Sequence, residues 1–299
     1  MTKLEVFGLK LPEVKPGDDL ARLIVEATSR EAGGLRDGDV IVVTSKVVSK
    51  AYGLLINIDE VKPSKKAFRI AKRTGVNPKI VQVILENSDN VLFVIPIKPL
   101  VERKLIGLEE LFEDPEYARK AIDMIPYMLI VERGGQVYSD AGLDFSNHPE
   151  GIASIPPRDP DRYAKLIRDG IKRMSGVDVA VVISDTEMFL GVYSLDFARG
   201  SSGIEVISKK FGALDRFGKP KFGGVDHIAH ELACAAALLM GQTDEGVPAV
   251  LFRGLRYARS EEGIKAYSLR PEAMKTALKL IIKETIRVLG IRSLLRLII

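Results

Sequence analysis

The chain has 299 residues, enough for one large domain or two modest ones, and its 46% hydrophobic and 28% charged residues are typical of a soluble globular protein. A net charge of +4, from 44 basic and 40 acidic residues, is too small to favour nucleic acid. No apolar run approaches the ~20 residues that span a bilayer, and the first residues lack a signal-peptide pattern. The lone Cys234 offers neither a disulfide nor a thiolate metal site. We therefore expect a cytoplasmic protein.

Helical and strand patterns alternate along the chain. Asp18 is a candidate N-cap for the first helix, which Gly33 and Gly34 would end. Helices are predicted over 20–34, from 63, from 78, within 96–127, over 160–174 and 225–240, and from 271 to a break near 290. Buried strands are predicted at the β-branched runs 40–43, 91–95, 128–131, 178–186 and 246–254. A Gly-rich irregular region is expected after Thr186.

This order predicts a mixed α/β (α+β) fold, with mixed sheets and flanking helices. We expect one domain over residues 1–255, with a sub-division near 150–160, and a helical extension over 256–299. Basic character belongs to this extension, because residues 263–299 carry eight Lys/Arg and two Glu. Its apolar residues recur at helical spacing, which favours packing on the body or on a partner subunit over a membrane-surface helix.

Four polar loops lie at or beside the ends of the apolar runs. They are TSKVVSK (44–50), DAGLDFSN (140–147), SDT (184–186) and MGQTDEGVP (240–248). Open sheets commonly place ligands at such positions. Asp, Thr and Gln oxygens suit a divalent cation, and lysines with backbone N–H groups suit a polyphosphate. Each loop alone is typical of a solvated turn, and none is a specific nucleotide motif.

Together and in this order, the four loops resemble the coenzyme F420-0:L-glutamate ligase family, which extends the glutamate tail of a deazaflavin coenzyme. DAGLDFSN resembles the family's NAGIDxSN signature, SDT matches directly, and MGQTDEGVPAVLFRG is similar throughout. LPEVKPGDDL and TSKVVSKAYG resemble further family segments. The resemblance covers roughly residues 4–255, with an insertion around 96–127. It implies an F420-0 gamma-glutamyl ligase-like fold that forms an intertwined homodimer.

The resemblance also implies a site. Asp144, Asp185 and Lys46 would be catalytic. The metal, Mg²⁺ or Mn²⁺ with K⁺ as a further cation, would be held by Asp144, Asp185, Thr186 and Gln242. GTP would contact Leu11, Pro12, Glu13, Val14, Ser45, Lys46, Lys50, Asn147, Met240, Gly241, Gln242, Thr243, Asp244, Glu245, Gly246 and Val247. Asp140 replaces the family's usual Asn, either as an acid behind the metal ligands or as a cap.

The sequence departs from the family after SDT. Where the family usually has a Gly-Arg pair, this chain has Glu187 and Met188, and only Arg199 follows nearby. Lys219, in DRFGKPK, stands where the family commonly has Arg. Arg binds carboxylate and phosphate bidentately. Because these Arg residues are absent here, we expect the part of the site that binds the acceptor to differ from that of the family. Ligase chemistry is favoured if Arg199, Arg216 or Lys219 fills this gap in three dimensions, and an apolar or closed pocket would favour a paralogue that ligates nothing.

A second cluster lies on the helix predicted over 225–240. His227, His230 and Glu231 have the spacing of one helix face, which a zinc site could use. Their order is not HExxH, and such spacing is ordinary among helix neighbours. Cys234 is typical of a small buried apolar residue, because no His–acid pair is arranged to activate it. We therefore expect structural or surface roles for this cluster.

The leading hypothesis is GTP-dependent amide ligation of L-glutamate to a carboxylate acceptor, coenzyme F420-0 or a related acid, through an acyl phosphate. One alternative is a ligase for a different acceptor. The other is a non-ligating nucleotide- and metal-binding paralogue with a regulatory or scaffolding role. No nucleic acid or membrane span is expected among the partners.

Overall fold

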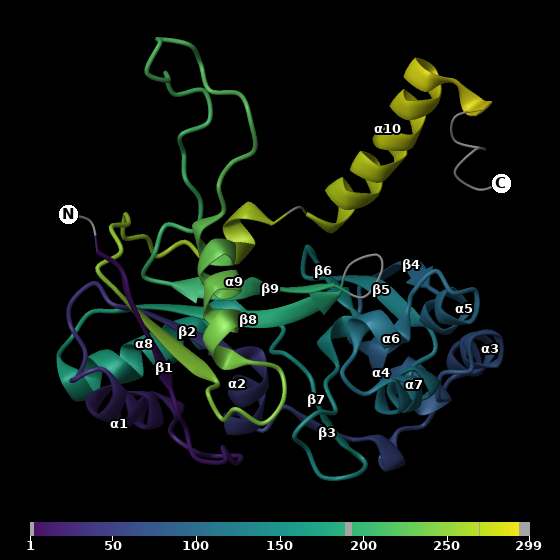
Figure 1. Ribbon diagram of the computed structural model, residues 1–299, viewed down its shortest axis with the longest axis horizontal. Helices are drawn as coiled ribbons and strands as arrows, with labels where there is room; N and C mark the ends of the chain where they lie inside the picture. Colours follow the sequence, from purple (N-terminus) through teal and green to yellow (C-terminus); the bar gives the residue numbers. More distant parts are fainter. Residues whose placement is uncertain (1–2, 189–192, 269, 293–299) are drawn as a thin grey trace.

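The computed structural model describes residues 3–188, 193–268 and 270–292 as a mixed α/β protein with two lobes (Figure 1). The sheet lobe holds a five-stranded sheet. The second lobe is built from residues 54–157, which are inserted between α2 (Ser45–Ala51) and α8 (Pro160–Ser175). The predicted fold class is confirmed, while the domain division after residue 255 and the sub-division near 150–160 stay predictions.

The five-stranded sheet has the order β1–β10–β2–β8–β9. Its strands are β1 (Glu5–Leu9), β2 (Val40–Thr44), β8 (Ala180–Met188), β9 (Ser194–Ser202) and β10 (Ala249–Arg253). β2 and β8 are parallel and the other neighbours are antiparallel. Thr44 therefore pairs with Ser184, and the loop after β2 lies beside the polar part of β8. The apolar runs of both strands are fully buried because helices cover both faces of the sheet.

Helices α1 (Leu20–Glu31), α2 and α8 pack on one face of this sheet, and α9 (Ile228–Met240) packs on the other (Figure 1). The predicted cap of α1 is wrong by one residue. Asp19 is the N-cap and accepts a hydrogen bond from Arg22 N, because the Asp18 side chain closes the preceding turn instead. The helix predicted over 20–34 is confirmed, and it ends at Glu31.

The second lobe contains two small antiparallel sheets. One consists of β4 (Asn90–Ile95), β5 (Met128–Arg133) and β6 (Gln136–Ser139), and the other of β3 (Leu55–Asn57) and β7 (Ile152–Ser154). Its helices are α3 (Lys65–Thr74), α4 (Pro78–Glu86), α5 (Ile97–Glu102), α6 (Leu108–Leu111) and α7 (Pro115–Met124), with 3₁₀ turns at Ile58–Glu60 and Asp140–Gly142. The helix predicted within 96–127 is three short helices, because Gly107 and Asp114 act as N-caps that interrupt it.

The irregular region expected after Thr186 is observed only in part: residues 203–227 contain no helix or strand, but the first part of the region is β-sheet. β8 continues to Met188 and pairs with β9, so the two strands form a long antiparallel hairpin. At Gly200 in β9, a Cβ would lie 2.6 Å from Asp161 N at the start of α8. This glycine therefore serves close packing of a strand on a helix, which sequence periodicity does not reveal.

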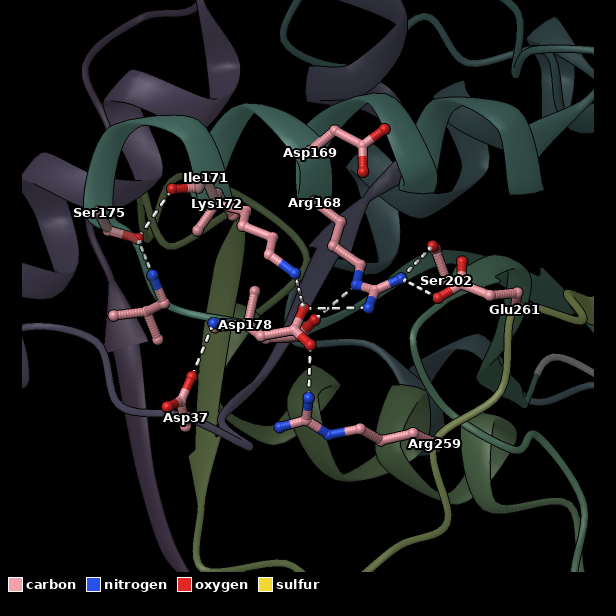
Figure 2. A network of polar contacts seen from close by, with 12 residues as sticks. Asp37, Arg168, Asp169, Ile171, Lys172, Ser175, Asp178, Ser202, Arg259 and Glu261 are labelled. Carbon is pink, nitrogen blue, oxygen red and sulfur yellow. Dashed lines mark hydrogen bonds and ion pairs between the residues drawn. The ribbon is translucent and has the colours of Figure 1, made fainter.

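A network of charged side chains stabilises the start of β8 (Figure 2). Arg168 on α8 is buried, and its guanidinium contacts Asp178 Oδ1 at 3.0 Å and Glu261 Oε1 at 2.7 Å. Arg259 also pairs with Asp178, whose backbone N–H donates to Asp37 Oδ1 at 2.8 Å. These bonds tie a helix, two loops and the segment after β10 together, at the opposite end of β8 from Asp185.

The last described helix, α10 (Pro271–Leu289), projects from the body in Figure 1 and exposes Leu280, Ile281, Val288 and Leu289. The predicted helical spacing is therefore confirmed, but its apolar side chains are not covered by the body. A long loop, residues 207–226, also extends away from the sheet. None of the described helices is long and apolar enough to cross a membrane.

Candidate functional site

A cleft of about 530 Å³ lies between the sheet lobe and the second lobe. Its walls come from the segment after β1, the β2–α2 junction, the 139–147 turn, β8, β9 and the loop before β10. Every residue predicted to hold nucleotide or metal lines this cleft. The structure therefore brings the four polar loops together, while the role of each residue stays a prediction.

The turn at the end of β6 has an unusual backbone. Asp140, Ala141 and Gly142 all have positive φ, at 45°, 59° and 76°. A Cβ on Gly142 would lie 2.6 Å from Pro156 Cγ and 3.2 Å from Asp185 Oδ2. Glycine is required here because its missing side chain leaves room beside the Asp185 carboxylate.

Asp140 fixes this turn to strand β5. Its Oδ1 accepts a hydrogen bond of 2.8 Å from the backbone N–H of Leu129 on β5. Burial raises its pKa from 3.8 to about 7, and the Glu187 carboxylate adds to the increase. Asp140 does not line the cleft, so of the two predicted roles the structure favours a cap that positions the turn.

Asp144 lies in the cleft and is held by the turn that follows it. Its Oδ1 accepts hydrogen bonds from Ser146 N at 2.8 Å and Ser146 Oγ at 2.7 Å. Lys46 Nζ lies 3.1 Å from Asp144 Oδ2 and also donates to Ser146 Oγ at 2.5 Å. Lys46, at the start of α2, thus puts a positive charge beside the Asp144 carboxylate, at the position that a cation bound to Asp144 would take.

Lys50, one turn further along α2, bonds to two other cleft segments, and one of these bonds to a third. It is only 7% exposed, and its Nζ donates to Glu13 Oε1 at 2.6 Å and to Asn147 O at 2.7 Å. Asn147 has a φ of 57°, and its side-chain amide donates to Thr243 O at 3.0 Å. The floor of the cleft is therefore a connected polar network.

Asp185 stands on β8 opposite Asp144. Its Oδ1 accepts a hydrogen bond of 2.8 Å from Ser45 Oγ. Its Oδ2 is buried, and no hydrogen-bond partner for it is found among the described residues. Burial raises the pKa of Asp185 to about 7; Arg199 opposes the increase, while Glu187 and Asp144 add to it.

Thr186 contacts Asp196, a residue that the sequence analysis did not identify. Its Oγ1 donates to Asp196 Oδ1 at 2.7 Å across the β8–β9 hairpin, where the two residues are register partners. Burial raises the pKa of Asp196, and hydrogen bonds from Thr186 and Gln242 lower it. Asp196 thus orients two of the predicted metal ligands. Ser139, at the end of β6, is the other cleft residue that the sequence analysis missed.

The donor set suits a hard cation that also binds a phosphate. Across the described residues, no three His, Cys, Asp or Glu side chains gather closely enough to hold a metal by themselves. Mg²⁺ commonly takes one or two protein carboxylates and completes its shell with substrate phosphates and water. The two carboxylates of Asp144 and Asp185, the unpaired Asp185 Oδ2 and the space left by Gly142 fit this mode of binding.

The three basic residues expected to fill the acceptor gap do not line the cleft, so they give the ligase hypothesis no support over the non-ligating paralogue. Arg199 is buried, pairs with Glu187 and stacks over the Tyr138 ring at 3.8 Å. Arg216 and Lys219 are exposed on the 207–226 loop, which extends away from the body (Figure 1). Among the described lining residues, the cationic side chains are those of Lys46 and Lys50.

The histidine cluster on α9 has structural contacts. The rings of His227 and His230 stack with centroids 3.5 Å apart, and His230 Nδ1 accepts a hydrogen bond from Ala198 N. Burial lowers the pKa of His230 to about 4, so its ring is neutral at pH 7. Burial raises the pKa of Cys234, whose Sγ donates to Asp196 O. These contacts are structural, and the two histidine rings also line a cavity beside the β8–β9 hairpin, so the role of the cluster stays a prediction.

Comparisons with known proteins place these features in one family. Residues 8–254 match the family F420-0:Gamma-glutamyl ligase. A coenzyme F420:L-glutamate ligase of Methanopyrus kandleri is 37% identical over 247 residues, 82% of this chain and 84% of its own length. Proteins of the same name are 36% identical in Methanothermobacter thermautotrophicus, over 91% of this chain and 97% of the relative, and in Archaeoglobus fulgidus, over 86% and 90%. The chain therefore belongs to the F420-0:gamma-glutamyl ligase family.

Proposed function

We propose that this chain is a GTP- and divalent-metal-dependent ligase that joins L-glutamate to a carboxylate acceptor, coenzyme F420-0 or a closely related acid. The observation that carries the proposal is the single cleft in which Lys46, Lys50, Asp144 and Asp185 meet from segments far apart in the sequence. Two lysines and two carboxylates at one site suit a nucleotide triphosphate with its cation. The relatives' name supplies the acceptor and the amino acid.

The reaction proceeds in two steps in this proposal. An acceptor carboxylate oxygen attacks the γ-phosphorus of GTP, the bond to the β–γ bridging oxygen breaks, and GDP leaves. The amine of L-glutamate then attacks the acyl carbon, the bond to the phosphate oxygen breaks, and inorganic phosphate leaves as the amine loses a proton. Lys46 and Lys50 stabilise the phosphate charge, and the 240–247 loop lies along the nucleotide.

Asp144, Asp185, Thr186 and Gln242 would hold Mg²⁺ or Mn²⁺, with K⁺ as a further cation. When bound, such ions neutralise the charge that develops on the transferred phosphoryl group. Ser45 orients Asp185, Ser146 orients Asp144, and Asp196 orients Thr186. A carboxylate held by a hydrogen bond on one oxygen keeps the other oxygen available for a cation.

We also propose that the protein is a cytoplasmic homodimer. The exposed apolar residues of α10, among them Ile281 and Val288, support the dimer, because such a stripe on a projecting helix is normally covered by a partner. Sedimentation of the wild type and of the double variant Ile281→Asp, Val288→Asp tests it. The wild type should have twice the mass of the variant. Equal masses would contradict the role of α10.

Calorimetric titration of GTP in the presence of Mn²⁺ tests the nucleotide half of the proposal. Asp144→Asn should abolish the binding that wild type shows, ATP serves as the nucleotide control, and Asp59→Asn changes an exposed carboxylate outside the cleft. An assay with F420-0 and L-glutamate tests the ligase half, where Asp185→Asn should lower the rate about a thousandfold. GTP binding without ligation of F420-0 or a related acid would favour the non-ligating paralogue. Absence of binding to well-folded protein would exclude both.

A further inference from the structure

A small cavity of about 40 Å³ lies where the second lobe joins the sheet lobe. It is lined by the β5–β6 hairpin, by the segment that leads from the second lobe into α8, and by the 3₁₀ turn Ile264–Tyr267 after β10. We call it the junction cavity. None of its described lining residues lines the cleft, so the two are separate sites.

The junction cavity is lined by a buried cation. Arg133, the last residue of β5, is only 5% exposed. Its Nη2 donates to Pro156 O at 2.6 Å, whereas its Nε and Nη1 are buried and have no hydrogen-bond partner among the described residues. It also forms no ion pair with any carboxylate in the part of the chain that the structure describes. Burial lowers the pKa of Arg133, yet a guanidinium stays protonated at neutral pH.

A buried guanidinium with two unpaired nitrogens favours an anion as its partner. Taking a charge out of water is costly unless an opposite charge and hydrogen bonds replace the water. Buried polar groups in folded proteins almost always have a hydrogen-bond partner, which can be an ion. The N–H groups of a guanidinium match the oxygens of phosphate and carboxylate. Such an oxyanion would supply both the opposite charge and the hydrogen bonds that Arg133 needs.

Two further cations line the junction cavity. Arg158 and Lys265 are both exposed, so their side chains can turn toward an anion without a change in the fold. Arg158 makes a long ion pair, in which its Nη1 lies 3.6 Å from Asp89 Oδ1. Together with Arg133, these residues give the cavity positive charge from both lobes.

Two carboxylates also line the junction cavity and offset part of this charge. Asp159 accepts a hydrogen bond of 3.2 Å from a backbone N–H of α8. Asp161 accepts hydrogen bonds from three backbone N–H groups, one in β9 and two in the 3₁₀ turn after β10. Both acids are thus held by backbone donors and do not pair with Arg133. Three cations against two acids leave the described lining with an excess of positive charge.

We propose that the junction cavity binds one small oxyanion, a phosphate or the carboxylate of a small acid, on the buried guanidinium of Arg133. A volume of about 40 Å³ admits only a few atoms, compared with about 530 Å³ in the cleft, so a nucleotide is too large. Because Arg133 belongs to the second lobe and Lys265 follows β10, the anion would join the two lobes. This inference does not depend on the proposed function.

Calorimetry and urea unfolding of the full chain test the proposal. Sodium phosphate and sodium acetate are each compared with sodium chloride at the same ionic strength, so that general screening is equal. Calorimetry measures the Kd of each anion, and urea unfolding is then followed at about a hundred times that Kd. The two anions distinguish a phosphate site from a carboxylate site.

Four variants locate the bound anion. Arg133→Met removes the buried charge and keeps an unbranched side chain. Lys265→Met removes an exposed cation of the cavity, so it should fold whatever the first variant does. Arg162→Met is the matched control, because Arg162 is exposed on α8 and lines neither the junction cavity nor the cleft. Lys46→Met reports on anions that bind in the cleft instead.

We expect phosphate, acetate or both to raise the urea midpoint of wild type by about 0.5–1 M over chloride. Arg133→Met should lose this increase and should unfold in chloride at about the wild-type midpoint, because an apolar side chain replaces an unpaired charge. Lys265→Met should raise the Kd about threefold or more. Arg162→Met and Lys46→Met should keep the increase.

Equal midpoints of wild type in all three salts would overturn the inference. An increase that Arg133→Met retains would overturn it as well, since the anion would then bind elsewhere, and loss of the increase in Lys46→Met alone would place the anion in the cleft. If Arg133→Met does not fold, a Kd in Lys265→Met equal to that of Arg162→Met would overturn it.

Discussion

Replacing Asp140 by Asn should stabilise the protein at alkaline pH and leave its stability nearly unchanged in acid. Asn keeps an oxygen that can accept the 2.8 Å hydrogen bond from Leu129 N, and it tolerates the positive φ of 45° well. It removes the buried carboxylate whose pKa is raised to about 7. The substitution therefore changes the charge and little else.

The magnitude and the sign follow from proton linkage. A carboxyl group whose pKa is 3.8 in the unfolded chain and about 7 in the fold binds its proton more tightly when folded. Its contribution to stability is complete below about pH 4 and is lost as the pH rises to 7, a difference of about 4 kcal/mol at pH 8 if nothing relaxes. We expect Asp140→Asn to gain about 2–4 kcal/mol over wild type at pH 8 and about zero at pH 4.

Urea unfolding at pH 4, 5, 6, 7 and 8 measures this difference. Asp140→Ala is the control, because it removes both the charge and the acceptor and leaves Leu129 N unsatisfied. It should gain less than Asp140→Asn at pH 8 and should be less stable than wild type at pH 4 by about 1–3 kcal/mol. A difference between the Asp140→Asn variant and wild type that does not depend on pH would refute the reasoning, because it would mean that Asp140 does not titrate between pH 4 and 7.

Three further predictions concern single residues. Gly142→Ala should lose about 2–4 kcal/mol in urea unfolding, because an Ala with φ of 76° is strained and its Cβ would lie 2.6 Å from Pro156 Cγ. An unchanged midpoint would contradict this. Lys46→Met should weaken GTP binding in calorimetry yet tighten Mn²⁺ binding in the absence of nucleotide about fivefold, because the ion pair with Asp144 competes with the cation; weaker binding of Mn²⁺ alone would count against it. Asp178→Asn should cost about 2–4 kcal/mol by leaving the buried Arg168 short of a charge partner, with the Kd of GTP unchanged. A changed Kd would show that the network of Figure 2 communicates with the cleft.

The loops that form the cleft could be predicted from the sequence because local signals specify them. Each follows or lies beside a β-branched run, a position at which open sheets commonly place ligands. The roles expected of Asp144 and Asp185 come from the resemblance to the family, and both residues line the cleft. Asp196 could not be found, because its contact with Thr186 depends on the register of a hairpin that the glycines around β9 disguised.

The sequence also could not show which of two adjacent acids is the N-cap of α1. Asp18 and Asp19 are both good caps, and only the path of the chain from Lys15 decides between them. Asp140 likewise had two possible roles until the position of Leu129 on β5 was known. Local patterns thus located the polar segments that form the cleft, whereas the contacts that each side chain makes depend on segments far apart in the sequence.

The position of β10 between β1 and β2 determines when the sheet can form during synthesis. Residues 249–253 must leave the ribosome before β1, synthesised first, can join its neighbour in the sheet. Until then β1 and β2 have unpaired edges that can join other chains. The second lobe consists of consecutive residues and needs no such wait. We therefore expect it to fold during synthesis, and the sheet lobe to be the part that depends on chaperones at this stage.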